Sequence, residues 1–408
     1  MGFSIDPHSL PSERQAALDE LFADIADASG EVEPIRPDEY ALRRGRLTEL
    51  LGQGSADAYL CEGGATMRYL TGMATGRSER LVGLVIPAAG DPFWIAPAFE
   101  QSRIEGLVGA AGGPGGTVLA WDEHEYPYRP LAAALAERRL ERLALDPDLR
   151  FRFAAGCARA MGQERIVDGL PLCTELRGRK DEHELALLRR ANELTQKAIL
   201  KTAETLEPGM TNRELAERVT WAQHRMGLKD IWNLSLIGPA GAFPHGEDRE
   251  RTMEFGSPLL VDTGGALHGY QSDNTRSWVL GGRPDASFTK LWNLVRDAQR
   301  AAFEALGPGQ PCAGPDAAAR EVIDAGGYGP GYRCFTHRLG HGIGTEGHEG
   351  PYCDGGSDVA MQAGMTFSNE PGIYLPGELG LRIEDIVTVT PDGGDHFGTW
   401  QLGPGSPA

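Results

Sequence analysis

Acidic side chains stand next to apolar, strand-like runs in the second half of the sequence. Asp262 ends the run LLVD, and Asp273 starts a second run that continues as TRSWVL. Two such runs around a glycine-containing turn predict a hairpin or two neighbouring strands. An Asp beside Gly is usually a turn residue. A carboxylate at each of two paired strands favours a functional site, because burying it without positive charge is costly.

Histidines gather in the glycine-rich segment THRLGHGIGTEGHEGPY, residues 336–352, which holds three of the ten in the chain. They are His337, His341 and His348, spaced by four and seven residues. Glycine allows a backbone to approach a ligand closely, and imidazole is a neutral nitrogen donor at physiological pH. A single histidine here would be an ordinary loop or core residue, but three of them indicate a site.

Two further acids, Glu370 in MTFSNEPGIYLPG and Glu384 in GLRIEDIVTVT, lie inside β-patterned apolar runs. An unpaired charge is unfavourable there, so each needs a partner. A salt bridge to Arg382 or Arg276 would satisfy either Glu alone.

Together, four carboxylates and one imidazole require compensating cations, and two divalent ions would supply four positive charges. Ligands of this kind favour Mn²⁺, Co²⁺ or Zn²⁺. Two such ions can share a hydroxide, polarise a carbonyl and stabilise a tetrahedral oxyanion, which is the chemistry of a hydrolase.

Four motifs occur in order: D-x-G-x-x-x-x-G-Y-x-S-D-x-T-R, H-x-x-G-H-G-I-G, N-E-P-G-I-Y and R-I-E-D. They resemble the creatinase/prolidase/aminopeptidase P family of "pita-bread" metallopeptidases, strongly from about residue 177 to 400. The motif R-Y-L-T-G, residues 68–72, and the strand-rich stretch after it resemble that family's accessory domain.

The resemblance implies roles for the clustered residues. Asp262 would hold one metal, His341 and Glu370 would hold the second, and Asp273 and Glu384 would bridge both. Glu370 would also handle the proton of the attacking water.

Other motif positions imply residues around the metals. His245, in F-P-H-G, and His348 match substrate-side histidines that can donate to the scissile carbonyl or the oxyanion. His337 matches a position behind the ligands, and Arg382 matches one that binds substrate and pairs with a ligand carboxylate. Some prolidases carry an Arg that grips the substrate carboxylate four residues after the histidine of H-E-x-P. Tyr352 stands there in this chain and is expected to bind substrate. A phenol donates one hydrogen bond and carries no positive charge, so a free C-terminus needs another group as well, such as one from the N-terminal domain of either subunit.

Placing these residues needs more than one core, because 408 residues exceed the usual single domain. Strand and helix patterns alternate over residues 36–170, which predicts an α/β domain. We expect an α/β (α+β) protein with a smaller creatinase-like α/β domain at 1–172 and a pita-bread catalytic domain at 173–408. Predicted helices cover residues 10–28, 37–51, 130–142, 181–207, 211–227 and 287–307, with caps at Asp181, Thr211 and Ser287.

The composition limits the partners and the compartment. The formal net charge of −19 disfavours nucleic acid and anionic membranes, and no window is long and apolar enough to span a bilayer. The six cysteines form no C-x-x-C pair and are expected to be reduced, and the N-terminus lacks a signal-peptide pattern. These features predict a cytoplasmic enzyme, and the resemblance implies a homodimer.

The leading prediction is a dipeptidase that cleaves the Xaa-Pro imide bond with a hydroxide held by two metals, Mn²⁺ before Co²⁺ or Zn²⁺. An aminopeptidase P-type Xaa-Pro aminopeptidase and a related amide hydrolase, such as an ectoine hydrolase, stay open as alternatives. A metal-free creatinase-type amidinohydrolase and a non-enzymatic binding module are disfavoured, since the full ligand set is present.

Overall fold

The computed structural model describes residues 5–110 and 112–408, and their contacts form two compact units. Of the described residues, those between 35 and 178 form one unit, and residues 5–34 and 179–408 form the other. This grouping differs from the sequence-based division at residues 172 and 173 in two ways. The boundary falls after a helix that contains residue 172, and the N-terminal arm packs with the second unit. Pattern in the arm itself could not indicate the unit on which it packs.

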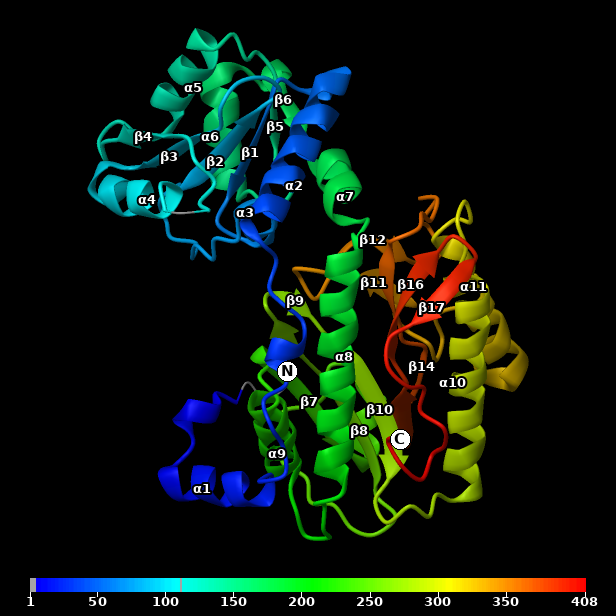
Figure 1. The fold of residues 1–408 in the computed structure, drawn as a ribbon. Coiled ribbons are helices and arrows are strands. Elements are labelled where there is room, and N and C mark those ends of the chain that lie inside the picture. Colours follow the sequence, from blue (N-terminus) through cyan, green and yellow to red (C-terminus); the bar gives the residue numbers. More distant parts are fainter. Residues whose placement is uncertain (1–4, 111) are drawn as a thin grey trace. The chain divides into compact units, whose positions relative to one another are not determined.

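Residues 35–178 form a mixed six-stranded sheet in the order β4-β3-β2-β1-β5-β6, with helices on both faces (Figure 1). Apolar clusters cover both faces, as an α/β domain requires. The strands are β1 Ala58–Glu62, β2 Gly83–Pro87, β3 Phe93–Pro97, β4 Thr117–Trp121, β5 Leu143–Leu145 and β6 Ile166–Asp168. The helices are α2 Pro37–Leu50, α3 Ala65–Thr71, α4 Gln101–Val108, α5 Tyr128–Glu137, α6 Phe151–Met161 and α7 Leu170–Arg177.

The second unit holds two larger sheets. One has the order β10-β8-β7 with β9 beside β8, the other has the order β12-β11-β13-β16-β17, and β14 pairs with β15. The first comprises β7 Lys229–Ile237, β8 Pro258–Leu267, β9 Tyr270–Gln271 and β10 Asn274–Val279. The others are β11 Gly340–Gly342, β12 Glu349–Cys353, β13 Thr366–Asn369, β14 Gly372–Leu375, β15 Leu379–Arg382, β16 Asp385–Thr390 and β17 Gly393–His396.

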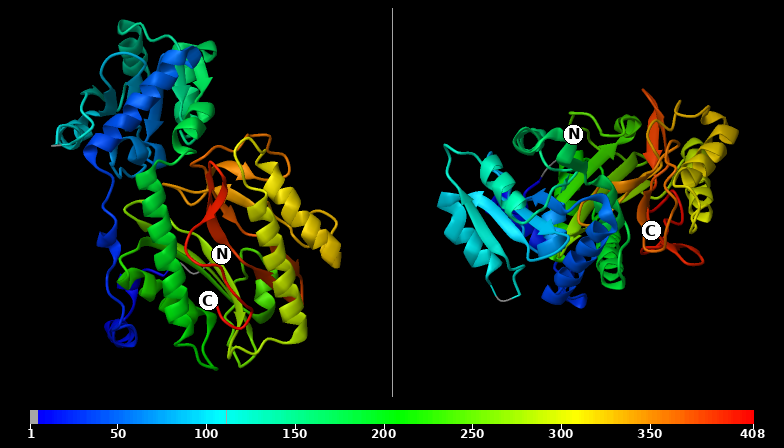
Figure 2. Two further views of the ribbon diagram at one scale, coloured as in Figure 1. Left: turned by 45° about the vertical axis from the view of Figure 1, so that its right-hand side comes forward. Right: turned by 90° about the horizontal axis from the view of Figure 1, so that it is seen from above.

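Four helices, α8 Glu182–Ala203, α9 Asn212–Arg225, α10 Ala286–Glu304 and α11 Ala313–Ile323, cover these sheets. Helices α8 and α9 pack on the sheet of β7, β8 and β10, while α10 and α11 pack on the other (Figures 1 and 2). The strands of this unit therefore lie between two helical layers, which is the predicted pita-bread arrangement.

Capping residues in the sequence predict where two of the three long helices α8, α9 and α10 begin. Capping boxes begin α8 at Asp181 with Glu184 and α9 at Thr211 with Glu214, as predicted. The start of α10 differs, because Asp285 rather than Ser287 accepts the capping bond, from the Phe288 amide.

The N-terminal arm is less helical than predicted. Helix α1 covers only Ser12–Leu21, because the chain then turns to bury Phe22 and Ile25. Asp19 accepts hydrogen bonds from Trp221 and Arg225, which anchors the arm to α9. Long-range burial has overridden the helical pattern beyond residue 21.

The described part of the chain contains no helix long and apolar enough to cross a membrane. All six cysteines are buried and free, in line with the expectation of reduced thiols.

Candidate active site and metal-binding groups

A cavity of about 1030 Å³ opens between the strands of the second unit. Nine of the ten predicted site residues line it, and only Tyr352 does not. The nine are His245, Asp262, Asp273, His337, His341, His348, Glu370, Arg382 and Glu384.

The predicted hairpin places the two aspartates. Strands β8 and β10 pair antiparallel with Asp262 opposite Thr275, which confirms the pairing inferred from the apolar runs. Asp262 does not end its strand as expected, because β8 continues through a glycine pair to Leu267. Side chains two residues apart share a face of a strand, so Asp273 lies on the same face as Thr275 and Asp262.

The remaining predicted ligands come from the second sheet. His341 is the central residue of β11, and Glu370 follows β13 directly. A Cβ at Gly340 would lie 1.9 Å from the Ser368 carbonyl oxygen, so this strand can approach β13 only with glycine there. Glu384 precedes β16 and forms a bridge with Thr275, which joins the two sheets at the site.

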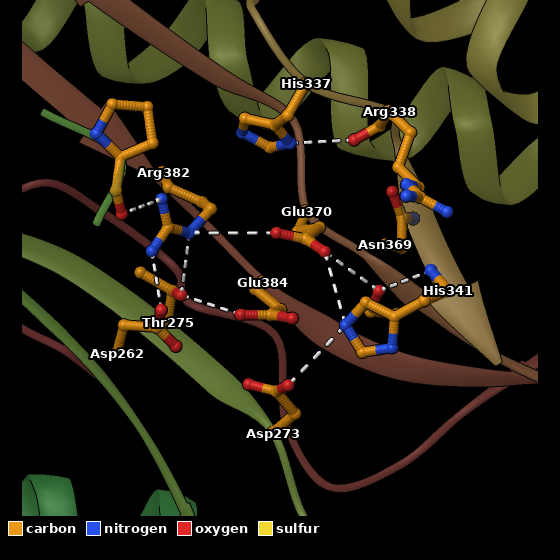
Figure 3. A network of polar contacts seen from close by, with 12 residues as sticks. Asp262, Asp273, Thr275, His337, Arg338, His341, Asn369, Glu370, Arg382 and Glu384 are labelled. Atoms are coloured by element: carbon orange, nitrogen blue, oxygen red, sulfur yellow. Dashed lines mark hydrogen bonds and ion pairs between the residues drawn. The ribbon is translucent and has the colours of Figure 1, made fainter. Parts of the chain in front are cut away.

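The His341 ring presents a lone pair to the acids. Its Nδ1 lies 3.0 Å from the Gly342 carbonyl oxygen, to which it donates, so Nε2 is an acceptor. Nε2 lies 3.6 Å from Asp273 Oδ2 and 3.5 Å from Glu370 Oε1 (Figure 3). Burial lowers the pKa of His341 to about 3, which keeps the ring neutral. The neutral ring therefore offers neither carboxyl a proton, and its Nε2 lone pair faces both of them.

The carboxylates disfavour one another's charge. Burial, and then the charges of Asp262 and Glu370, raise the pKa of Asp273 well above its usual value. Burial and the charge of Asp273 do the same for Glu384. Burial also raises the pKa of Glu370 to about 7. The raised pKa values of these three carboxyl groups mean that too little positive charge lies nearby to stabilise their ionised forms.

Two buried oxygens, Asp262 Oδ1 and Asp273 Oδ1, have no hydrogen-bond partner. Ligand atoms of Asp262, Asp273 and Glu384 all lie within 4.8 Å of one another, and so do those of His341, Glu370 and Glu384. Glu384 belongs to both groups. A third group joins Asp273, His341 and His348. The donor set, the orphaned oxygens and the overlapping groups fit divalent cations.

The salt-bridge alternative accounts for little of this charge. Arg382 Nη2 lies 2.6 Å from Asp262 Oδ2, whereas its Nε is 3.9 Å from Glu370 Oε2. Arg276 pairs instead with Asp385, at 2.7 Å. Only one arginine therefore contacts the four carboxylates among the described residues.

Residues that sequence reasoning had not singled out hold the acids in place. The Thr275 hydroxyl donates to Glu384 Oε2 at 2.7 Å and accepts from Arg382 Nε. Arg382 also donates to the Tyr374 hydroxyl, which lies 2.7 Å from His337 Nε2. Thr275 belongs to the motif that ends in D-N-T-R, and Tyr374 belongs to N-E-P-G-I-Y. Their motif positions could have identified them from the sequence.

Of the residues predicted to face the substrate, His245 and His348 line the cavity and Tyr352 does not. His348 stacks on His341 with ring centroids 3.7 Å apart, and His245 lines the same cavity. Tyr352 lies opposite His341 in the pairing of β11 with β12. Its ring packs against the Arg338 guanidinium, 4.4 Å from the ring centroid.

Comparisons with known proteins agree with this architecture. Residues 186–391 match the profile of "Metallopeptidase family M24", and residues 43–178 match "Creatinase/Prolidase N-terminal domain". The matches confirm the family resemblance and the predicted fold class.

Relatives match along most of the chain. A "Probable dipeptidase PepE" of Mycobacterium bovis is 36% identical over 85% of this chain and 92% of its own length. An "Xaa-Pro dipeptidase" of Lactobacillus delbrueckii subsp. lactis is 30% identical over 86% of this chain and 95% of its own. The crystal structure of dipeptidase PepE from Mycobacterium ulcerans superimposes with a TM-score of 0.82 and 31% identity, covering 90% of this chain and 97% of that one.

Proposed function

The chain belongs to metallopeptidase family M24 as an enzyme of the dipeptidase type, and on this premise we propose that it hydrolyses the imide bond of Xaa-Pro dipeptides. One observation carries the proposal. Four carboxylates and a neutral imidazole nitrogen converge in a cavity large enough for a small peptide, and among the described residues Arg382 is the arginine that ion-pairs with them.

We propose two divalent ions per chain, Mn²⁺ before Co²⁺ or Zn²⁺. Asp262 would hold one ion, His341 and Glu370 would hold the other, and Asp273 and Glu384 would bridge them. The overlap of the candidate groups at Glu384 supports a shared ligand. When bound, the ions would neutralise the carboxylates, activate water and polarise the scissile carbonyl.

The protein's own groups would move the proton. A Glu370 carboxylate oxygen would accept it from the attacking water and return it to the prolyl nitrogen as that atom leaves. The Ser368 hydroxyl donates to Glu370 Oε1 at 3.1 Å, which supports one orientation of this carboxylate.

His245 and His348 would bind the substrate carbonyl. Burial lowers the pKa of His348, so its ring is neutral and carries one N–H donor. Such a donor aimed at the developing oxyanion stabilises the transition state more than the ground state.

The experiment compares alanyl-proline, an Xaa-Pro-Xaa tripeptide and alanyl-alanine, with and without chelator. We expect cleavage of alanyl-proline that chelator abolishes and Mn²⁺, Co²⁺ or Zn²⁺ restores. Faster cleavage of the tripeptide would favour an aminopeptidase. Activity that survives complete metal removal, or metal analysis showing fewer than two ions in active protein, would refute the metal assignment.

We also propose a homodimer, as in the family that the motifs resemble. Light scattering under assay conditions should give twice the chain mass of 43.9 kDa. Full activity of a monomer after dilution would count against it.

A further inference from the structure

Arg338 is an arginine of the active-site cavity whose charge offsets part of the rise in the pKa of Glu370 that burial causes, but which forms no ion pair with a carboxylate of the described residues. It lines the cavity, and its side chain is exposed. No carboxylate of the described residues lies within ion-pairing distance of its guanidinium, and Figure 3 shows none bonded to it. Arg382, the other arginine of the cavity, is committed to Asp262. Arg338 is therefore the arginine available to a ligand.

The backbone of Arg338 is held in place by the chain of bonds that supports the metal-binding acids. His337 Nδ1 lies 2.7 Å from the Arg338 carbonyl oxygen and donates to it, which leaves Nε2 to accept from the Tyr374 hydroxyl. Tyr374 in turn accepts from Arg382. The Arg338 backbone is thereby tied to the group that holds Asp262, while its side chain stays free to bind.

The guanidinium rests on an aromatic support. It lies 4.4 Å from the centroid of the Tyr352 ring, and a cation over a ring face is attracted by the ring quadrupole. Tyr352 is the cross-strand neighbour of His341, so the residue whose ring contacts Arg338 lies next to a proposed metal ligand. This stacking restricts a long, flexible side chain before any ligand arrives.

We propose that Arg338 binds the free carboxylate of a dipeptide substrate and that Tyr352 positions it through its ring. The inference rests on the proposed function, because only a short substrate brings its C-terminus this close to the reacting bond. A cavity rich in carboxylates repels a substrate carboxylate unless a cation receives it, and a guanidinium can do so with two parallel hydrogen bonds. One further residue displaces the terminal carboxylate by roughly 3.8 Å, out of that geometry.

The test uses two substrates with the same scissile bond, alanyl-proline and alanyl-prolinamide, which lacks the carboxylate. For Arg338→Gln, KM for alanyl-proline should rise roughly 10- to 150-fold, the effect of losing hydrogen bonds to a charged group. KM for the amide should stay within about twofold, since no carboxylate is involved. Arg333→Gln, an exposed arginine five residues earlier outside the cavity, is the matched control and should change neither. Equal losses for both substrates would overturn the proposal.

Two Tyr352 variants separate the ring from the hydroxyl. Tyr352→Phe keeps the support and should leave KM near the wild-type value, whereas Tyr352→Leu removes it and should raise KM for alanyl-proline alone. If Tyr352→Phe raises KM for alanyl-proline while Arg338→Gln leaves it unchanged, the phenol rather than the guanidinium binds the carboxylate.

A binding measurement keeps this inference distinct from the proposed function. Should the metal-loaded wild type cleave neither substrate, the proposed function fails. Calorimetry of alanyl-proline with wild type and Arg338→Gln then tests the carboxylate site directly. A Kd at least about tenfold weaker for the variant supports the inference, and equal Kd values refute it.

Discussion

At the residue scale, the site brings several carboxyl groups against one imidazole with little positive charge nearby. The neutral His341 ring turns its Nε2 lone pair toward the nearest oxygens of Asp273 and Glu370, which lie within 3.6 Å. Among the described residues, Arg382 ion-pairs with these carboxylates and the hydroxyls of Thr275 and Ser368 donate side-chain hydrogen bonds to them. The residues would bind cations without rearranging, because their side chains already converge.

Glu370→Gln tests the proton acceptor, because it keeps the shape of the side chain and removes its basicity. We expect kcat for alanyl-proline to fall at least about 100-fold while the circular dichroism spectrum and the bound metal are retained. Glu378→Gln, an exposed residue in the turn between β14 and β15, is the matched control and should be inert. Near-normal kcat with full metal occupancy would remove Glu370 from this role.

His348→Ala distinguishes a substrate group from a metal ligand. If His348 acts on the carbonyl, kcat should fall by about 10²- to 10³-fold with metal content unchanged, and His245→Ala should behave alike. The exposed His124→Ala is the control. Loss of metal in His348→Ala would instead assign this ring to the ion that Asp273 and His341 can reach.

At the scale of strands and helices, the register between sheets keeps the acids on the cavity side. Thr275 and Glu384 form the bridge between the sheets, and on the reverse side Arg276 pairs with Asp385 at 2.7 Å. A slip of one residue in either strand would exchange these faces. The buried Arg276–Asp385 pair therefore stabilises the register that keeps the carboxylates on the cavity side.

A second buried ion pair joins Lys180, two residues before α8, to Glu349 at the start of β12. Lys180 Nζ lies 2.6 Å from Glu349 Oε1, with side-chain exposures of 1% and 5%. Glu349 follows His348 directly, so the pair also holds the backbone next to His348 in place.

Lys180→Met should lower the free energy of unfolding by about 3–5 kcal/mol, because it leaves the Glu349 carboxylate buried without its cation. Urea unfolding measures the change. The double variant Lys180→Met/Glu349→Leu should recover much of the loss, since no lone charge remains. Lys201→Met breaks the solvent-exposed pair with Asp24 and should change the stability much less than Lys180→Met does. Equal losses for Lys180→Met and Lys201→Met would contradict the expectation.

At the scale of the whole molecule, metal binding and stability are linked. Ions that bind the folded chain at 100 times their Kd stabilise it by about 2.7 kcal/mol. The effect of Asp273→Asn on Tm should have opposite signs with metal and with chelator. It weakens metal binding and so lowers Tm with metal present, but it raises Tm in chelator because it removes one of the mutually repelling buried charges. Scanning calorimetry of both proteins measures this, and a variant less stable in both conditions would show that Asp273 serves chiefly the fold.

Local chemistry in the sequence determined which residues could form the site. The ligand types, the motif order, the capping boxes at Asp181 and Thr211 and the apolar runs of β8 and β10 each depend on neighbouring residues, so they could be predicted. Residue types alone also indicated that the clustered acids need cations, because burial of charge has the same cost in any fold.

Only the tertiary structure decided how these parts meet. The N-terminal arm stops being helical at Leu21, where Phe22 and Ile25 become buried and Arg225 donates to the Ile25 carbonyl oxygen. Arg382 pairs with Asp262, and Arg338 stacks on Tyr352, through side-chain positions that no local pattern encodes. Such contacts depend on strand register and on residues far apart in the chain, whose free energies are settled only when the sheets come together.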